Sequence, residues 1–161
     1  MAQANLTQAE YTEKEIGSWF ALFDDTKPGV PATAFVAKSS FTRHLTKVAL
    51  DDTTMHVGCD GTKNFIFFDF DVPLKSEAKE KSNVSYQFDE GKFTNAKWNL
   101  STNGKAFMVP NPEKFIKNLL TVKLLLVKVV NAQTSEEINS YFNISDLPEA
   151  FQFVRENCPW K

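Results

Sequence analysis

The segment from residue 53 to residue 72 constrains the fold most, because it joins two alternating segments through a tight-turn signal. Asp60-Gly61 is a dipeptide that accepts the positive φ of a hairpin loop. Before the turn, Met55, Val57 and Cys59 share one face, since side chains alternate along a strand. After the turn, one face carries Ile66, Phe68, Phe70 and Val72, and the other carries Phe65, Phe67, Asp69 and Asp71. The sequence therefore predicts a β-hairpin with one apolar face and one face that mixes aromatic rings with carboxylates.

The rest of the chain repeats this β-rich character. Its 161 residues include 15 Phe, 3 Tyr and 3 Trp, and aromatic rings favour pleated, sheet-rich interiors. Turn residues separate further alternating segments, with connections too short for parallel crossovers. We therefore expect an α+β fold, mainly an antiparallel β-sheet or β-sandwich with a few short helices, including a C-terminal helix.

The first 31 residues are expected to differ from the remainder. Thr7 and Glu10 have capping-box spacing, and residues 5–23 carry an imperfect apolar stripe, which predicts a helix. Acids, Pro and Gly follow it. The sequence thus predicts an N-terminal helix and linker at residues 1–31 and a single antiparallel β-rich domain at residues 32–161.

Two helices are predicted in the C-terminal half. Asn111 followed by Pro112 is typical of a helix start. Asp146 and Glu149 are placed to cap a last helix. One face of that helix carries Leu147, Phe151, Val154 and Cys158.

The two cysteines are both expected to point inward. Cys59 lies on the apolar face of its strand, and Cys158 lies on the apolar face of the last helix. We predict a disulfide between them; two free buried thiols are the alternative. A disulfide favours an oxidising compartment and therefore an exported protein.

The N-terminus and the charge limit the location and the partners. Met1 to Ala4 leads into a polar segment without the apolar region of a signal peptide. We expect a mature periplasmic protein whose signal peptide has been removed; a cytoplasmic protein is the alternative. No apolar run reaches the roughly 20 residues of a membrane span. The net charge of −2, without a basic tract, argues against nucleic acid as a partner.

The sequence carries no recognised catalytic, metal-binding or cofactor-binding motif. His44 and His56 are the only histidines, and neither has metal-ligand spacing. Nucleophile-elbow and phosphate-loop patterns do not occur. We therefore expect a protein that is not an enzyme, with no catalytic residue, metal or cofactor; a hydrolase with an unrecognised site is a less favoured alternative.

The mixed face of the hairpin is the candidate site for a protein partner. Phe65 and Phe67 would form an aromatic patch rimmed by Asp69 and Asp71, as recognition surfaces often are. In the alternative interpretation, a second sheet or a helix covers the rings and leaves the acids in water.

Several short motifs follow one another in an order that resembles a known family. They are the strand ending at Cys59, Tyr86-Gln87-Phe88-Asp89, Trp98-Asn99-Leu100-Ser101, Phe142-Asn143-Ile144-Ser145-Asp146-Leu147 and Cys158-Pro159-Trp160. This order resembles the VasI/TagO-like family of type VI secretion-associated periplasmic proteins. Gly58 and Gln87 stand where the family has Arg, and Asp146 stands where it has Gly. The resemblance implies an exported, non-enzymatic domain of the Gram-negative envelope.

Together these features predict an envelope accessory protein that binds other proteins, associated with type VI secretion. The alternative is an immunity, inhibitor or phage-encoded protein that binds and blocks one effector. The oligomeric state is left open by the sequence.

Overall fold

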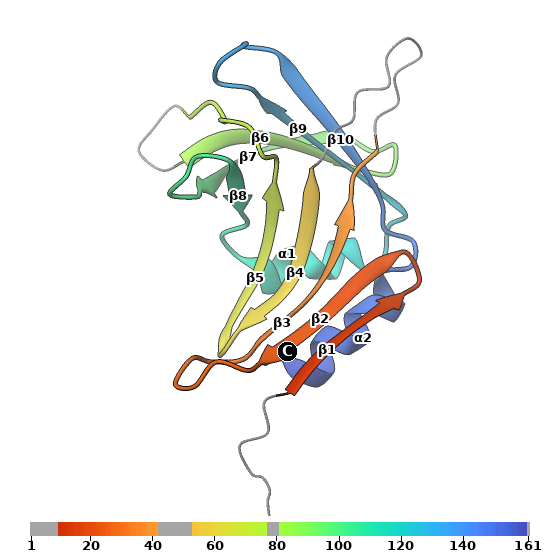
Figure 1. Cartoon of the computed structure of the whole chain (residues 1–161). Helices are drawn as coiled ribbons and strands as arrows, with labels where there is room; N and C mark the ends of the chain where they lie inside the picture. The colour runs from red at the N-terminus through yellow and green to blue at the C-terminus, as the bar shows by residue number, and fades with distance from the viewer. Residues whose placement is uncertain (1–9, 42–52, 77–80, 161) are drawn as a thin grey trace, which may run out of the picture.

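The computed structural model describes residues 10–41, 53–76 and 81–160 of the 161-residue chain (Figure 1). Ten strands and two helices occur in these residues. In chain order they are β1 (Glu10–Ile16), β2 (Trp19–Asp25), β3 (Thr33–Ser39), β4 (Thr54–Asp60), β5 (Lys63–Asp69), β6 (Lys81–Phe88), β7 (Phe93–Leu100), β8 (Ala106–Met108), α1 (Pro112–Leu119), β9 (Leu124–Val130), β10 (Glu137–Asn143) and α2 (Leu147–Asn157).

All paired strands are antiparallel and belong to one sheet, with the order β1-β2-β3-β4-β5-β8-β7-β6-β9-β10. The predicted antiparallel fold with short helices, one of them C-terminal, is therefore confirmed.

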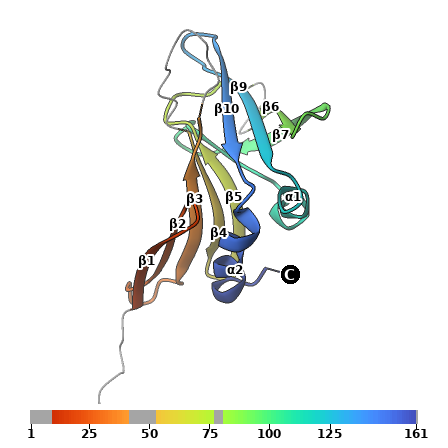
Figure 2. The same cartoon turned by 90° about the vertical axis from the view of Figure 1, so that its right-hand side faces the viewer.

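The sheet curls, so that strands far apart in the strand order share one core (Figures 1 and 2). The Phe68 ring on β5 lies 5.6 Å from the Phe142 ring on β10 and 5.4 Å from the Trp98 ring on β7. Phe41, after β3, makes an isolated bridge with Tyr141 of β10. β1 and β10 nevertheless remain the two edges of the sheet. Because the described strands form a single sheet, a β-sandwich is not confirmed.

The two helices lie on the same side of the sheet (Figure 2). α2 packs against β2, β3 and β4, and α1 packs against β5. Their buried side chains meet the inward side chains of these strands in one core, which includes Trp19, Val36, Met55, Val57, Ile66, Phe68, Phe115, Leu119, Phe151 and Val154. Within the described residues, the opposite face of β2–β5, which faces the reader in Figure 1, has no helix on it.

The predicted hairpin of residues 53–72 is confirmed as β4 and β5. Asp60 pairs with Lys63, and Gly61 in the turn has a φ of 65°, a conformation that glycine adopts without steric cost. The predicted inward residues of the two strands, Met55, Val57, Cys59, Ile66 and Phe68, are all buried. The hairpin therefore lies within the core, with three strands of the sheet beyond it toward β1 and five toward β10.

The predicted N-terminal helix is wrong. Residues 10–25 form the β1–β2 hairpin, which turns at Gly17 with a φ of 61°. β2 then pairs with β3, so these residues belong to the same sheet as the rest of the domain and are not a linker. Thr7 of the proposed capping box lies outside the described residues. Pairing with β3 and burial of Trp19 outweigh the weak helical signal.

Candidate functional site

The uncovered face of β2–β5 presents the largest group of aromatic side chains outside the core. Directly paired residues of an antiparallel sheet point to the same face. Two rows of paired positions cross these strands: Phe20, Ala37, His56 and Phe67 form one, and Leu22, Phe35, Gly58 and Phe65 form the other. We define the aromatic face as Phe20, Leu22, Phe35, His56, Phe65 and Phe67.

Stacking contacts hold the rings of the aromatic face together. The His56 imidazole stacks on Phe67, with centroids 4.3 Å apart and an interplanar angle of 9°. Phe35 contacts the other side of the group, 5.2 Å from His56, and Phe65 lies 5.3 Å from Phe67. Such ring pairs stabilise beyond the area that they bury. The face is therefore an ordered surface, because its rings fix one another's orientation.

A pocket of about 310 Å³ opens on the aromatic face. It is lined by Phe20, Phe35, Ala37, Lys38, Ser39, Thr54 and His56. Phe20 is 40% exposed, so one wall of the pocket is a ring that meets solvent. This volume is at the lower end of the range of ligand pockets and suits one large side chain better than an extended ligand.

The imidazole of His56 is neutral at physiological pH. Burial lowers its pKa from 6.5 to about 4, and the nearby Asp69 carboxylate offsets only part of this effect. The Nδ1 atom is buried and has no hydrogen-bond partner. His56 therefore contributes an uncharged aromatic surface to the pocket at neutral pH.

Of the four residues predicted to bind a partner, Phe65, Phe67 and Asp69 lie on the uncovered side of the hairpin, and Asp71 follows the end of β5 with a φ of 56°. Phe65 and Phe67 are half-buried by neighbouring rings of the same face. Asp69 is half-buried at the end of β5, and Asp71 is exposed. The backbone N–H of Asp71 donates to Asp69 Oδ1 at 3.0 Å. Among the described elements, neither a helix nor a second sheet covers these rings.

Sequence reasoning missed the contribution of β2 and β3 to this surface. Phe20 lies in the segment predicted as a helix, and no role in the site was predicted for Phe35. The alternation of buried Trp19 and Ala21 with exposed Phe20 is the strand signal that could have located them. His56 lies on the face opposite Cys59 and lines the pocket, whereas His44 lies outside the described residues.

A polar cluster joins the β1–β2 turn to the start of α2. Asp146 accepts hydrogen bonds from the Ser18 backbone N–H at 2.7 Å, the Ser18 hydroxyl at 2.6 Å and Trp19 Nε1 at 2.9 Å. Lys38 Nζ lies 3.8 Å from Asp146 Oδ1 and donates to Ser18 Oγ and to the carbonyl oxygen of Asn143, each at 2.5 Å. Asp146 occupies the N-cap position of α2 as predicted, but its side chain makes no capping hydrogen bond.

The charges and hydrogen bonds of the cluster act on one another, and the cluster forms a clamp between distant parts of the chain. Desolvation raises the pKa of Asp146, but hydrogen bonds from Ser18 and Trp19 and the charge of Lys38 lower it overall. Burial lowers the pKa of Lys38, and Asp146 opposes that shift. Through these contacts Asp146, Ser18 and Lys38 link the β1–β2 turn and β3 to the start of α2.

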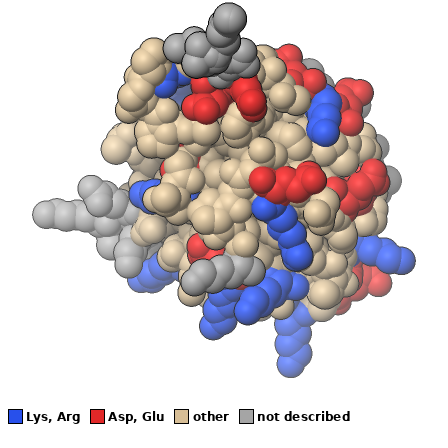
Figure 3. Space-filling view, turned by 90° about the horizontal axis from the view of Figure 1, so that it is seen from below, with Lys and Arg blue, Asp and Glu red and all other residues tan. Residues whose placement is uncertain are grey.

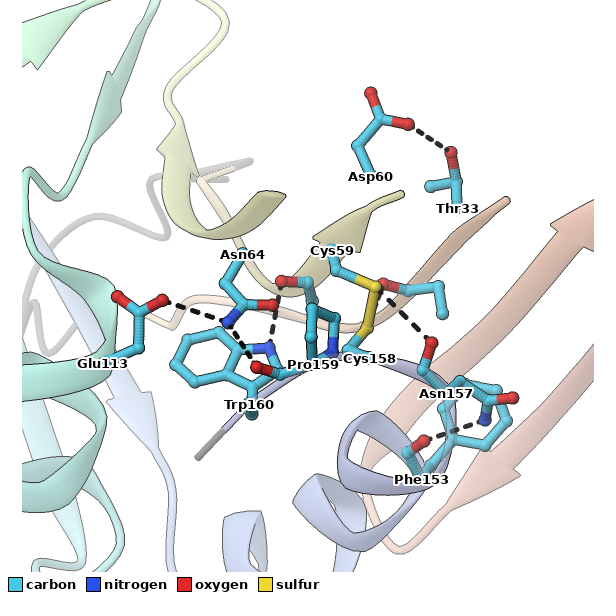
Figure 4. The surroundings of a disulfide bond; sticks show 12 residues. Thr33, Cys59, Asp60, Asn64, Glu113, Phe153, Asn157, Cys158, Pro159 and Trp160 are labelled. Carbon is cyan, nitrogen blue, oxygen red and sulfur yellow. Dashed lines mark hydrogen bonds between the residues drawn. A yellow bond between two sulfur atoms is a disulfide. The ribbon is translucent and has the colours of Figure 1, made fainter. Parts of the chain in front are cut away.

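The predicted disulfide is confirmed and ties the hairpin to the C-terminus. Cys59 of β4 and Cys158 after α2 are joined, with Cα atoms 5.7 Å apart (Figure 4). Beside the bond, Trp160 Nε1 donates to the carbonyl oxygen of Gly58 at 3.1 Å. Asn64 of β5 donates to Glu113 of α1 at 3.0 Å and to the Pro159 carbonyl oxygen at 3.3 Å. The disulfide therefore lies on the inner side of the hairpin whose outer side carries the aromatic face.

The described residues show neither a metal-ligand cluster nor a membrane-spanning helix. They contain no group of three or more His, Cys, Asp or Glu side chains that could hold a metal ion. None of their helices has the length and apolarity needed to cross a membrane.

Comparison with known proteins identifies a shared fold. No protein-family model and no curated protein matches the sequence. Among solved structures, the chain is similar to the crystal structure of invasion associated protein B from Bartonella henselae, with a TM-score of 0.59 and 15% sequence identity. The match covers 90% of this chain and 96% of that one. At this identity the similarity shows the fold alone.

Proposed function

We propose that this chain is an exported, non-enzymatic protein of the bacterial envelope that binds another protein through its aromatic face. One observation carries the proposal: a pocketed group of aromatic side chains lies on the side of the sheet away from both helices. Large apolar patches on a soluble domain commonly mark interaction sites, and aromatic residues dominate binding hot spots.

The disulfide supports an exported location. Disulfides persist in oxidising compartments such as the periplasm and are rare in the cytosol. The Cys59–Cys158 bond links two distant parts of the chain, so it would be a structural bond in the mature protein. We place the protein in the periplasm on this ground.

The association with type VI secretion rests on the resemblance of the motif order to the VasI/TagO-like family. The solved neighbour with the same fold is named an invasion associated protein. The protein we propose is therefore an accessory factor that contacts another envelope protein. An immunity or inhibitor protein would use the same face to block one effector.

The experiment is an affinity capture from envelope extract with the oxidised protein as bait. We compare the unaltered chain with Phe20→Glu, which places a charge in the exposed wall of the pocket. Phe93→Glu is the matched control, because Phe93 is 45% exposed and lies on β7, away from the aromatic face. Circular dichroism verifies that each variant is folded.

The proposal requires a partner that the unaltered chain and Phe93→Glu both retain and that Phe20→Glu loses. A partner held in one-to-one ratio, whose own activity falls on binding, would select the inhibitor over the accessory factor. Equal capture by all three baits would refute the proposal.

A further inference from the structure

The aromatic face has an acidic border. The sheet register extends each row of the face into neighbouring strands, and the paired residues point to the same side. The carboxylates on this side of β1–β5 are Glu13, Glu15, Asp24, Asp60 and Asp69. The corresponding basic side chain in these paired positions is Lys63. Side-chain carboxylates are ionised at neutral pH, so the border is negative.

The acids surround the rings on three sides. Glu13 and Glu15 of β1 pair with Leu22 and Phe20 and border one side of the aromatic face. Asp24 and Asp60 lie beyond the row that contains Leu22 and Phe65, and Asp69 lies beyond the row that contains Phe20 and Phe67. The whole chain has a net charge of only −2, so this surface is more acidic than the average.

Two lysines lie near the face. Lys63 pairs with Asp60 at its border, and Lys38 lines the pocket. In the view from below, acidic side chains lie along the upper and right-hand edges, and Lys and Arg side chains are most numerous along the lower edge but also occur near the upper one (Figure 3). Because the carboxylates outnumber Lys63 in the paired positions, the aromatic face has a net negative potential that selects among partners.

The acidic border disfavours the simplest occupant, a second copy of the chain. Two copies packed face to face would bring the acidic borders of Glu13, Glu15 and Asp69 together. Like charges brought together at an interface cost several kcal/mol. A basic partner gains attraction from the same border.

We infer that the aromatic face binds a basic protein segment in which lysine or arginine residues flank one aromatic anchor. The anchor ring enters the pocket between Phe20, Phe35 and His56, and its cationic neighbours meet the acidic border. The pocket, at about 310 Å³, holds a single aromatic side chain, which neutral His56 and Phe35 can contact through their rings. This inference rests on the proposed function and specifies the chemistry of its partner.

The direct test uses three synthetic heptapeptides and ¹⁵N-labelled protein. The first peptide has the sequence Lys-Ala-Lys-Trp-Lys-Ala-Lys, the second replaces each Lys with Glu, and the third replaces Trp with Ala. We expect the first peptide to shift the backbone amide signals of Phe35, Ala37 and His56 in the NMR spectrum. The other two should bind at least ~10-fold more weakly, the discrimination of about 1.4 kcal/mol that a single hot spot supplies.

The charge of the border is tested by reversal. Glu13→Lys combined with Glu15→Lys should lower the affinity for the first peptide by ~10-fold or more. Raised salt should also lower the affinity of the unaltered protein for this peptide. The matched control combines Glu90→Lys with Glu136→Lys, which makes the same change of net charge at exposed turn positions. Glu13→Gln with Glu15→Gln serves as the milder pair if the reversed variant does not fold.

The outcomes separate the inference from the proposed function. Equal binding of the basic and acidic peptides, no shift with any peptide, or shifts away from the pocket would overturn the inference. If Phe20→Glu loses the captured envelope partner while Glu13→Lys/Glu15→Lys retains it, the partner is not basic and the proposed function stands. If Phe20→Glu retains that partner, both are wrong.

Discussion

Reduction of the Cys59–Cys158 disulfide should destabilise the domain strongly. The two cysteines are 99 residues apart, so the bond closes a loop of most of the chain. In the chain-entropy model, a closed loop of about 100 residues stabilises the folded state by about 4.7 kcal/mol. This is an upper value, because a compact unfolded chain loses less freedom on cross-linking.

Reduction should leave the folded structure largely unchanged, because local packing still holds the C-terminus in place. The loss of stability therefore comes from the greater freedom of the unfolded chain. Trp160 would still donate to the Gly58 carbonyl oxygen, and its ring would still meet Phe151 at 5.3 Å. Those contacts keep the C-terminus beside β4 in the reduced protein. We therefore expect a loss of roughly 3–4 kcal/mol in the free energy of unfolding, or about 6–16 °C in Tm for a chain of this size.

The assay is urea unfolding followed by circular dichroism, with and without dithiothreitol. The reduced protein retains both sulfur atoms, so its comparison with the oxidised protein isolates the covalent link. Cys59→Ala with Cys158→Ala should unfold at a midpoint close to that of the reduced protein. A loss below about 1 kcal/mol on reduction would refute the reasoning, since it would mean that the link constrains little of the unfolded chain.

Three other perturbations have defined outcomes. The folded-state pKa of His56 is lowered from 6.5 to about 4, so the free energy of unfolding should fall by about 3 kcal/mol as the pH drops from 6.5 toward 4 and His56 must be protonated. His56→Phe should flatten that part of the curve of unfolding free energy against pH. Asp146→Asn removes the negative charge of the clamp and should lower the free energy of unfolding by roughly 1 kcal/mol, measured by urea titration. The difference between the variant and the unaltered chain should shrink as the pH falls below 3.8, because the Asp146 carboxylate, whose pKa is lowered in the folded state, then becomes protonated. Gly58→Ala should lower Tm by more than 5 °C in a thermal melt, or roughly 2 kcal/mol, because the new Cβ would lie 2.0 Å from the Ala34 carbonyl oxygen.

The parts of the fold that follow from local pattern were predictable. Residues 53–72 alternate strictly around a turn dipeptide, and the last helix repeats its apolar residues at three- and four-residue spacing. Cys59 lies on the inward face of its strand as predicted, whereas Cys158 follows the end of α2 in extended conformation and not on the helix face where the pattern had placed it, and the predicted pairing holds nevertheless. The glycine at position 58 also has a physical reason, since β3 approaches this position too closely for a side chain.

The N-terminal strands were missed because β2 bears apolar residues on both of its faces. Adjacent Trp19 and Phe20 fit a helical stripe, yet in β2 they point to opposite sides, one into the core and one into the aromatic face. Strand order is equally hidden, because β5 pairs with β8 and β6 pairs with β9, which are contacts between distant residues. Without that order, the acidic residues of β1 could not be placed beside the rings of β4 and β5.

One strand connects the stability of the protein with its proposed site. β4 sends Cys59 inward to the disulfide and His56 outward to the pocket, three residues earlier. Both helices pack on the inner side, so the β4–β5 hairpin is held from behind by α1, α2 and the C-terminal tail. A surface fixed in this way loses little conformational freedom when a partner binds, and preorganisation of this kind increases affinity. Reduction of the disulfide should therefore weaken partner binding even where the protein stays folded, because it loosens the support of the strand that positions His56.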